Sequence, residues 1–200
     1  GNIKKAVFTP IAQDATRVAA LISGNVDMAY PVPVQDWKRL DDAKGVMPLA
    51  GPEARTIFLG FDQLRDELLY SNIKGKNPFK DLRVRQAFIK AIGIDAIKKK
   101  VMRGASVPAG LLVAPQINGY NASLNDRPSY DPKAAKKLLA DAGYPNGFEV
   151  TMDCPNDRYV NDERICQAAA SMLAKIGVKV TLLAQTKSKY YGKVLAQNNY

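Results

Sequence analysis

Histidine is absent from the 200 residues of this sequence. Its absence removes the side chain that proteins use most often as a general base near neutral pH and as a transition-metal ligand. Cysteine is also scarce, since Cys154 and Cys166 are the whole set, and their spacing fits neither a metal-ligand motif nor a redox motif. A disulfide between them and two buried free thiols are both compatible with the sequence, whereas a fold built mainly on disulfides is excluded.

Long apolar runs are missing as well, although hydrophobic residues make up 46% of the chain. No run approaches the ~20 residues that a membrane-spanning helix needs, so the apolar residues are expected to build a sizeable core. No secretory signal is visible, but the sequence begins at Gly1 rather than at a methionine. We therefore expect a trimmed or processed start, and the missing signal says nothing about where the protein resides.

Acidic residues are outnumbered by basic ones, 19 against 29, which gives a formal net charge of +10. Such a balance is compatible with nucleic acid, an anionic surface or acidic ligands. The longest basic run, residues 98–100, lies in a helix-like segment with Ile94 and Ile97 on its other side. Aromatic residues do not alternate with lysines as single-strand binding requires. We expect a solvated basic surface and no nucleic-acid partner; the rival predicts DNA affinity that falls steeply with salt.

The apolar pattern switches repeatedly between the helical and the strand period, which predicts an α/β fold with a mixed, mostly parallel sheet flanked by helices. Strands are predicted at residues 3–11, 26–32, 54–62, 148–153 and 178–185. Helices are predicted at residues 14–23, 35–43, 82–102 with a break at Gly93 and a new cap at Asp95, 131–142, 161–176 and from 188 onward.

Residues 129–150 carry the clearest local signals. Asp131 is predicted as the helix N-cap, and Pro132 stands at the first helical position, where its missing N–H costs nothing. Gly143 is predicted to end the helix, and the alternation from Phe148 onward predicts a half-buried strand. By contrast, residues 104–129 have no periodic pattern, and loops of that length are usually functional or form irregular walls.

Catalytic motifs are weakly represented. The carboxylate pairs Asp41–Asp42 and Asp153–Asp157 have the chemistry for acid–base catalysis, but we interpret them as exposed loop and helix-end charges. Cys154 as a nucleophile would lack a histidine base. No glycine-rich phosphate loop is present. We expect no enzyme and no cofactor; an enzyme that uses Cys154 or a carboxylate pair remains the rival, which mild thiol alkylation would test.

A binding site is better supported by the turn at residues 155–161, which follows a predicted strand and precedes a helix. Ligands of open α/β sheets bind beyond the carboxyl ends of the strands. Arg158 is able to clamp a carboxylate through two parallel hydrogen bonds, and Tyr159 offers a flat wall with a polar tip. Asn161 completes the turn. The alternative is that Arg158 pairs with a carboxylate of the same turn and that Tyr159 caps the sheet edge.

Four stretches, at residues 16–30, 77–97, 130–150 and 158–182, resemble in order the extracytoplasmic solute-binding proteins of ABC importers. The similarity is to the dipeptide, oligopeptide and nickel-binding family, extracellular solute-binding family 5. It implies two lobes joined at a hinge, with a solute trapped between them and delivered to a membrane permease. Residues 1–50 then form a strand–helix–strand segment near the hinge, and residues 51–200 form most of the second lobe, truncated at its C-terminal end.

The resemblance implies a periplasmic or other extracytoplasmic, membrane-associated protein, which we expect to be a monomer that binds a peptide-like solute. The same family leaves a nickel chelate, haem, an oligosaccharide or an opine as alternative solutes. In dipeptide-binding relatives an arginine in the matching turn holds the ligand carboxylate, and Arg158 stands at that place, with Arg164 as its competitor. The family motif near Asp62 usually carries asparagine. The expected ligand-binding residues are Arg158, Tyr159, Asn161 and Asp62, whereas Arg83 and Arg85 are expected to be structural.

Overall fold

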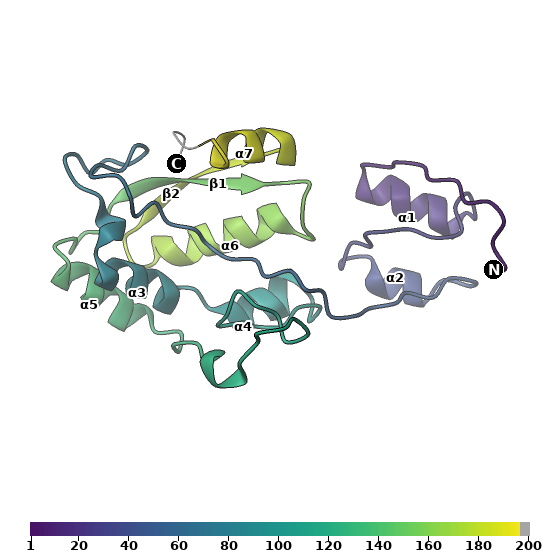
Figure 1. Ribbon diagram of the computed structural model, residues 1–200, viewed down its shortest axis with the longest axis horizontal. Coiled ribbons are helices and arrows are strands. Elements are labelled where there is room, and N and C mark those ends of the chain that lie inside the picture. Colours follow the sequence, from purple (N-terminus) through teal and green to yellow (C-terminus); the bar gives the residue numbers. More distant parts are fainter. Residues whose placement is uncertain (197–200) are drawn as a thin grey trace. The chain divides into compact units, whose positions relative to one another are not determined.

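The computed structural model describes residues 1–196, which separate into two compact units. The first unit covers residues 1–51 and contains two short helices, α1 (Asp14–Ile22) and α2 (Trp37–Asp41). Both helices lie where the apolar spacing predicts them. The second unit begins at Pro52 and contains the sheet and the remaining described helices (Figure 1).

Arg17 of α1 ties the first unit together. Its side chain is largely buried, and its guanidinium donates to the backbone carbonyls of Pro31 and Ile11 at 2.8 Å each. Val18 and Leu40 are buried in the same unit. Because the desolvated guanidinium has hydrogen-bond acceptors, the arginine of the first family-like stretch acts as a structural residue.

Three predicted strands, at residues 3–11, 26–32 and 54–62, are wrong, because the structure has no strand in any of them. Several of their apolar side chains stay exposed, with Phe8 91% and Phe58 63% accessible, whereas Phe61 packs against the core. A strand needs a neighbour to pair its backbone N–H and C=O groups. Among the described residues, no strand lies alongside these segments. Alternating apolar residues predict a face that can be buried, but they do not supply the partner.

The sheet of the second unit is built on two parallel strands, β1 (Glu149–Pro155) and β2 (Lys179–Gln185), joined by helix α6 (Asp162–Ala174). The other edge of β1 is joined by the preceding chain, since Ser71 forms an antiparallel bridge with Val150. The pairing is therefore mixed and mostly parallel. The predicted α/β class, with a sheet flanked by helices, is confirmed.

Helices α3 (Leu82–Ala91), α5 (Pro132–Asp141) and α6 lie on one side of the strands, and α7 (Lys187–Val194) lies on the other (Figure 1). The core is aromatic at its centre, where the rings of Phe79 and Phe88 have centroids 5.3 Å apart. Helix α7 agrees with the helix predicted from residue 188, of which residues 197–200 lie outside the described residues. The buried cluster consists of Leu68, Phe79, Val84, Ala87, Phe88, Ala91, Ala135, Leu139, Phe148, Val150, Leu173, Ile176 and Val178.

The predicted helix cap at Asp131 is confirmed. The Asp131 carboxylate accepts the N–H of Ala134 at 2.9 Å, and Asp81 caps α3 in the same way. The expected structural roles of two arginines are also confirmed: Arg83 donates to the carbonyl of Asp141 at the end of α5 at 2.6 Å. Arg85 donates to backbone carbonyls in the short 3₁₀ turn that precedes α3.

The predicted cap at Asp95 is wrong. Helix α4 (Ile94–Ala96) has Gly93 in the N-cap position, and Asp95 lies inside its first turn. The carbonyl of Gly93 already accepts the N–H groups of Ala96 and Ile97, so the helix starts before Asp95 is reached. The basic run continues α4 as a π-helical turn, Ile97–Val101. No helix of the described chain is long and apolar enough to cross a membrane.

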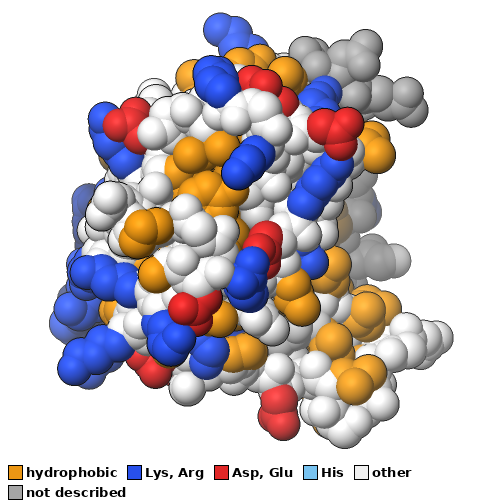
Figure 2. Space-filling view, turned by 90° about the vertical axis from the view of Figure 1, so that its left-hand side faces the viewer, with side chains coloured by type: hydrophobic (Ala, Val, Ile, Leu, Met, Phe, Trp, Pro, Cys, Tyr) orange, Lys and Arg blue, Asp and Glu red, His pale blue; other side chains and the backbone are white. Residues whose placement is uncertain are grey.

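The face of the molecule drawn in Figure 2 carries basic side chains interspersed with acidic ones and with apolar patches. Exposed ion pairs of the chain include Lys137–Asp141 and Lys179–Glu149, with N–O distances of 2.6 and 2.9 Å. Pairs of this kind contribute little stability, roughly 0–1 kcal/mol each. On that face the excess of positive charge is distributed rather than gathered into one stripe.

Candidate functional site

The turn between β1 and α6 occupies the carboxyl end of the parallel strands, as the sequence predicts. β2 ends beside it and leads into α7, whose first N–H, on Lys187, is accepted by the carboxylate of Asp157 from this turn. The turn is thereby attached to three elements: the strand before it, the helix after it and the helix that follows β2.

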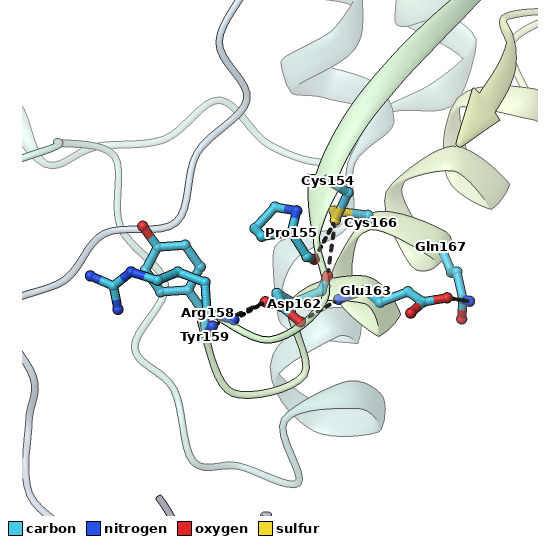
Figure 3. Close-up of a disulfide and its surroundings, with 8 residues drawn as sticks. All are labelled: Cys154, Pro155, Arg158, Tyr159, Asp162, Glu163, Cys166 and Gln167. Atoms are coloured by element: carbon cyan, nitrogen blue, oxygen red, sulfur yellow. Dashed lines mark hydrogen bonds between the residues drawn. A yellow bond between two sulfur atoms is a disulfide. The ribbon is translucent and has the colours of Figure 1, made fainter. Parts of the chain in front are cut away.

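Asp162 fixes the shape of this turn from its buried position at the start of α6. The residue is 5% exposed, and its carboxylate accepts the N–H groups of Arg158 at 2.9 Å and Tyr159 at 3.0 Å (Figure 3). A third N–H, from Glu163, bonds to its other oxygen at 2.9 Å. Hydrogen bonds to an ionised acceptor are about twice as strong as neutral ones, so the turn is held in one conformation.

Asn161 stands at the N-cap position of α6 with a left-handed backbone, φ 57°. Its side-chain amide donates to the carbonyl of Val101 at 2.9 Å, at the end of the π-helical turn. Left-handed backbone is uncommon outside glycine and asparagine, which accounts for asparagine here. The amide of Asn161 thus connects the turn to the rest of the unit.

The two cysteines are joined in a disulfide, which decides between the two states that the sequence leaves open. Cys154 lies in β1 and Cys166 lies in the second turn of α6, with Cα atoms 6.6 Å apart (Figure 3). The bond encloses the whole turn between strand and helix. Because Cys154 is also fully buried, no thiol is available for the nucleophilic chemistry considered above.

Arg158 and Tyr159 point away from the disulfide (Figure 3). The guanidinium carbon of Arg158 lies 4.7 Å from the centre of the Tyr159 ring, a cation–π arrangement. In the described part of the chain the Arg158 guanidinium has no ion pair. The acidic neighbours are engaged elsewhere: Asp162 binds backbone N–H groups, and Glu163 accepts from the side chain of Gln167. The alternative pairing of Arg158 within its own turn is therefore wrong.

Tyr159 connects the turn to α7. Its hydroxyl lies 3.0 Å from that of Tyr191, and the Tyr191 ring contacts Tyr190 with centroids 5.1 Å apart. The hydrogen bond with Tyr191, together with burial, raises the pKa of Tyr159, so the phenol stays protonated at neutral pH. Sequence reasoning missed Tyr191, because it lies 32 residues away and only the fold brings the two rings together.

Asp62 is not brought together with the other three predicted site residues. It follows Phe61, whose ring packs on Phe79, and Phe79 contacts Phe148 immediately before β1 begins. That is the opposite end of the strand from Arg158. The Asp62 carboxylate accepts the N–H of Leu64 and the side chain of Arg65, at 3.0 and 2.7 Å. Burial alone would raise the pKa of Asp62, but these hydrogen bonds lower it below its usual value.

The carboxylates considered above as acid–base pairs bind other groups or lie exposed. Asp153 binds Lys193 of α7 through both oxygens at 2.8 Å, whereas Asp157 caps α7. Asp41 and Asp42 are exposed at the end of α2, as predicted. Within residues 1–196, no three side chains of histidine, cysteine, aspartate or glutamate gather in a way that would hold a metal ion. What the turn offers is a cation and an aromatic wall, suited to binding an anionic group.

Known proteins are similar to this chain in both sequence and fold. The sequence model of bacterial extracellular solute-binding proteins, family 5 middle region, matches residues 1–200. The glutathione-binding protein GsiB of Escherichia coli (strain K12) is 31% identical over 177 residues, covering 88% of this chain and 32% of that protein. The structure of AgaA from A. tumefaciens R10 in complex with agropinic acid is 30% identical, with a TM-score of 0.68, covering 92% of this chain and 35% of that one.

A dipeptide-binding protein from Pseudoalteromonas sp. SM9913 in complex with Met-Leu has a TM-score of 0.72 at 23% identity. The match covers 94% of this chain and 35% of the dipeptide-binding protein, and at this identity it supports the fold alone. The chain spans about a third of the length of the curated relatives it matches. These relatives are named as binding proteins and not as enzymes. The chain belongs to the bacterial extracellular solute-binding proteins of family 5.

Proposed function

We propose that this chain contributes one side of a solute-binding cleft in a two-lobed transport protein, and that the solute is a small peptide-like molecule with a carboxylate. The observation that carries the proposal is the turn between β1 and α6. It presents the Arg158 guanidinium at the carboxyl end of parallel strands, with no ion pair to it among the described residues. A cation in that position gains most from an anionic ligand group.

The chemistry of the relatives' ligands supports a carboxylate. Glutathione, the ligand in the name of GsiB, is a tripeptide with two carboxylates, and agropinic acid, the ligand of AgaA, is an acid by name. In our proposal Arg158 holds the carboxylate through two parallel N–H···O bonds. Tyr159 provides the wall beside it, whereas Asn161 and Asp62 serve the protein scaffold.

Solute capture would be completed by a second lobe. In this proposal the bound solute contacts both lobes, shifts a hinge equilibrium towards the closed form, and the closed form docks on an ABC permease. The protein would work outside the cytoplasm, in the periplasm of a bacterium with two membranes. The Cys154–Cys166 disulfide supports this location, because disulfides persist in oxidising compartments.

Native mass spectrometry on the complete reading frame, purified without refolding and mixed with di- to pentapeptides, tests the proposal. We expect the wild-type protein to retain a peptide and Arg158→Ala to lose it. A retained opine would support the alternative that the likeness to AgaA suggests, a family member that imports an acidic non-peptide solute. Equal retention by wild type and Arg158→Ala would contradict the role of Arg158.

A further inference from the structure

A second candidate site lies on the side of α6 that faces α4. A half-open cavity of about 610 Å³ is lined there by α4 with its π-helical extension, the long irregular loop, and the C-terminal half of α6. Ser171 and Met172 line it from α6, Lys175 from the C-cap of that helix, and Arg127 and Tyr130 from the loop. Its size falls within the roughly 300–1,000 Å³ of small-molecule sites.

The cavity wall combines apolar surface with an excess of positive charge. Ile94, Ile97 and Met172 contribute the apolar part, and Arg127, Lys100 and Lys175 are basic, against one carboxylate, Asp95. The two lysines have no ion pair among residues 1–196. Arg127 is half-buried, and within the described residues its guanidinium donates one hydrogen bond, to the carbonyl of Ile89 at 3.3 Å. Burial lowers the pKa of Arg127, which the attraction of Asp95 partly offsets.

The irregular loop forms a fixed wall. Asn125 accepts the N–H groups of Gly110 at 2.9 Å and Leu111 at 3.2 Å, which clamps two distant parts of the loop together. The backbone approaches so closely that a Cβ at Gly110 would lie 2.5 Å from the carbonyl oxygen of Asn125. At the other end, the ring of Tyr130 rests against Gly93, where a Cβ would lie 3.4 Å from the ring. A long loop held in this way is suited to line a preformed site.

We propose that this cavity binds a small organic anion with an apolar body, at a site separate from the Arg158 turn. Desolvating a cation is costly unless an anion or strong acceptor compensates. Within residues 1–196 the Arg127 guanidinium has one long hydrogen bond and the attraction of Asp95 to do so. The carboxylate or other anionic head lies among the three basic side chains. The apolar body lies against the isoleucines and Met172.

The test uses the 200-residue chain and a matched pair of probes, 4-phenylbutyrate and its neutral analogue 4-phenylbutan-1-ol. Binding is followed by two-dimensional NMR at the backbone amides of Gly93, Gly110 and Ser171. We expect saturable shifts of these amides with the acid, and affinity about tenfold weaker for the alcohol, as the loss of one charged contact implies. The Arg158 and Tyr159 amides are expected not to shift.

Two variants test whether the lysines of the cavity bind the anionic group. Lys100→Gln combined with Lys175→Gln removes no side-chain hydrogen bond among residues 1–196. The double variant is expected to weaken binding of the acid about tenfold and to leave binding of the alcohol unchanged. Lys136→Gln, on the exposed side of α5, is the matched control and is expected to have no effect. Equal affinity for acid and alcohol, shifts confined to the Arg158 turn, or no saturable shift up to the solubility of the acid would overturn the proposal. None of these outcomes depends on the transport function.

Discussion

Removal of the Asp162 carboxylate is the perturbation that most directly tests how the turn between β1 and α6 is held. In Asp162→Ala the N–H groups of Arg158, Tyr159 and Glu163 lose their acceptor. Hydrogen bonds to a charged group contribute about 1.5–3 kcal/mol each. Water can reach the half-buried turn and replace part of this loss, so we expect a local destabilisation of about 2–4 kcal/mol in total.

Amide hydrogen exchange measures this local loss. A destabilisation of about 2 kcal/mol corresponds to roughly thirtyfold faster exchange, since each 1.4 kcal/mol is a factor of ten. We expect that acceleration at the amides of Arg158 and Tyr159 in Asp162→Ala, and little change in the core strand β1, whose pairing does not involve Asp162.

Glu163→Gln is the matched control, because it also removes a carboxylate at the start of α6. The Glu163 side chain accepts one bond from Gln167 at 3.1 Å on the exposed side of the helix. Pairs of this kind contribute about 0.2–0.5 kcal/mol, so exchange in the turn should change by less than about threefold. Equal exchange in the two variants, or no acceleration in Asp162→Ala, would refute the assigned role of Asp162.

Three further predictions concern the packing at Gly147, the pH dependence of stability, and peptide binding by the 200-residue chain alone. Gly147→Ala is expected to lower the free energy of unfolding in urea by about 3 kcal/mol or more, because its Cβ would lie 2.0 Å from the Gly177 carbonyl oxygen. Gly75 has a similar φ but open space around it, so Gly75→Ala should lower it by only about 1 kcal/mol. Equal losses in the two variants would contradict the packing argument. The folded-state pKa of Asp62 is lowered, so its carboxylate adds stability above its ordinary pKa and loses it as pH falls through the folded pKa. Asp62→Asn should therefore flatten the stability–pH profile below about pH 4, and an unchanged acid limb would count against this. The 200-residue chain alone is expected to bind peptides weakly or not at all, and calorimetry that gives sub-micromolar affinity would contradict a cleft shared between two lobes.

Elements set by local signals could be predicted from the sequence. The helix at Pro132–Asp141 has its cap, its first-turn proline and its apolar face within twelve residues of sequence, and the structure has it at that place. The two strands that formed, β1 and β2, are those that the chain itself supplies with partners. The segments at residues 3–11 and 54–62 have strand-like alternation but no partner among the described residues, so pattern alone gave the wrong state.

The candidate site was predictable in its position and only partly in its contacts. A turn after a parallel strand and before a helix points to Arg158 and Tyr159 from the sequence. The role of Tyr191 was not predictable, because it depends on how the chain returns over the sheet. Asp162 binds N–H groups within four residues of itself, but this pattern depends on the exact conformation of the turn, which the sequence does not specify. The disulfide likewise requires the side chains of a strand residue and a helix residue to point towards each other. Their separation of twelve residues in the sequence does not determine this.

Isothermal titration calorimetry of the complete protein with its retained solute, comparing Arg158→Ala with Arg164→Ala, tests the central claim most directly. Both variants remove one positive charge from the same segment, but Arg164 is exposed on α6. Loss of one partner of a buried charge pair costs about 2–5 kcal/mol. We therefore predict at least roughly thirtyfold weaker binding for Arg158→Ala and unchanged binding for Arg164→Ala. Equal affinities in the two variants would contradict the claim that this turn holds the solute carboxylate.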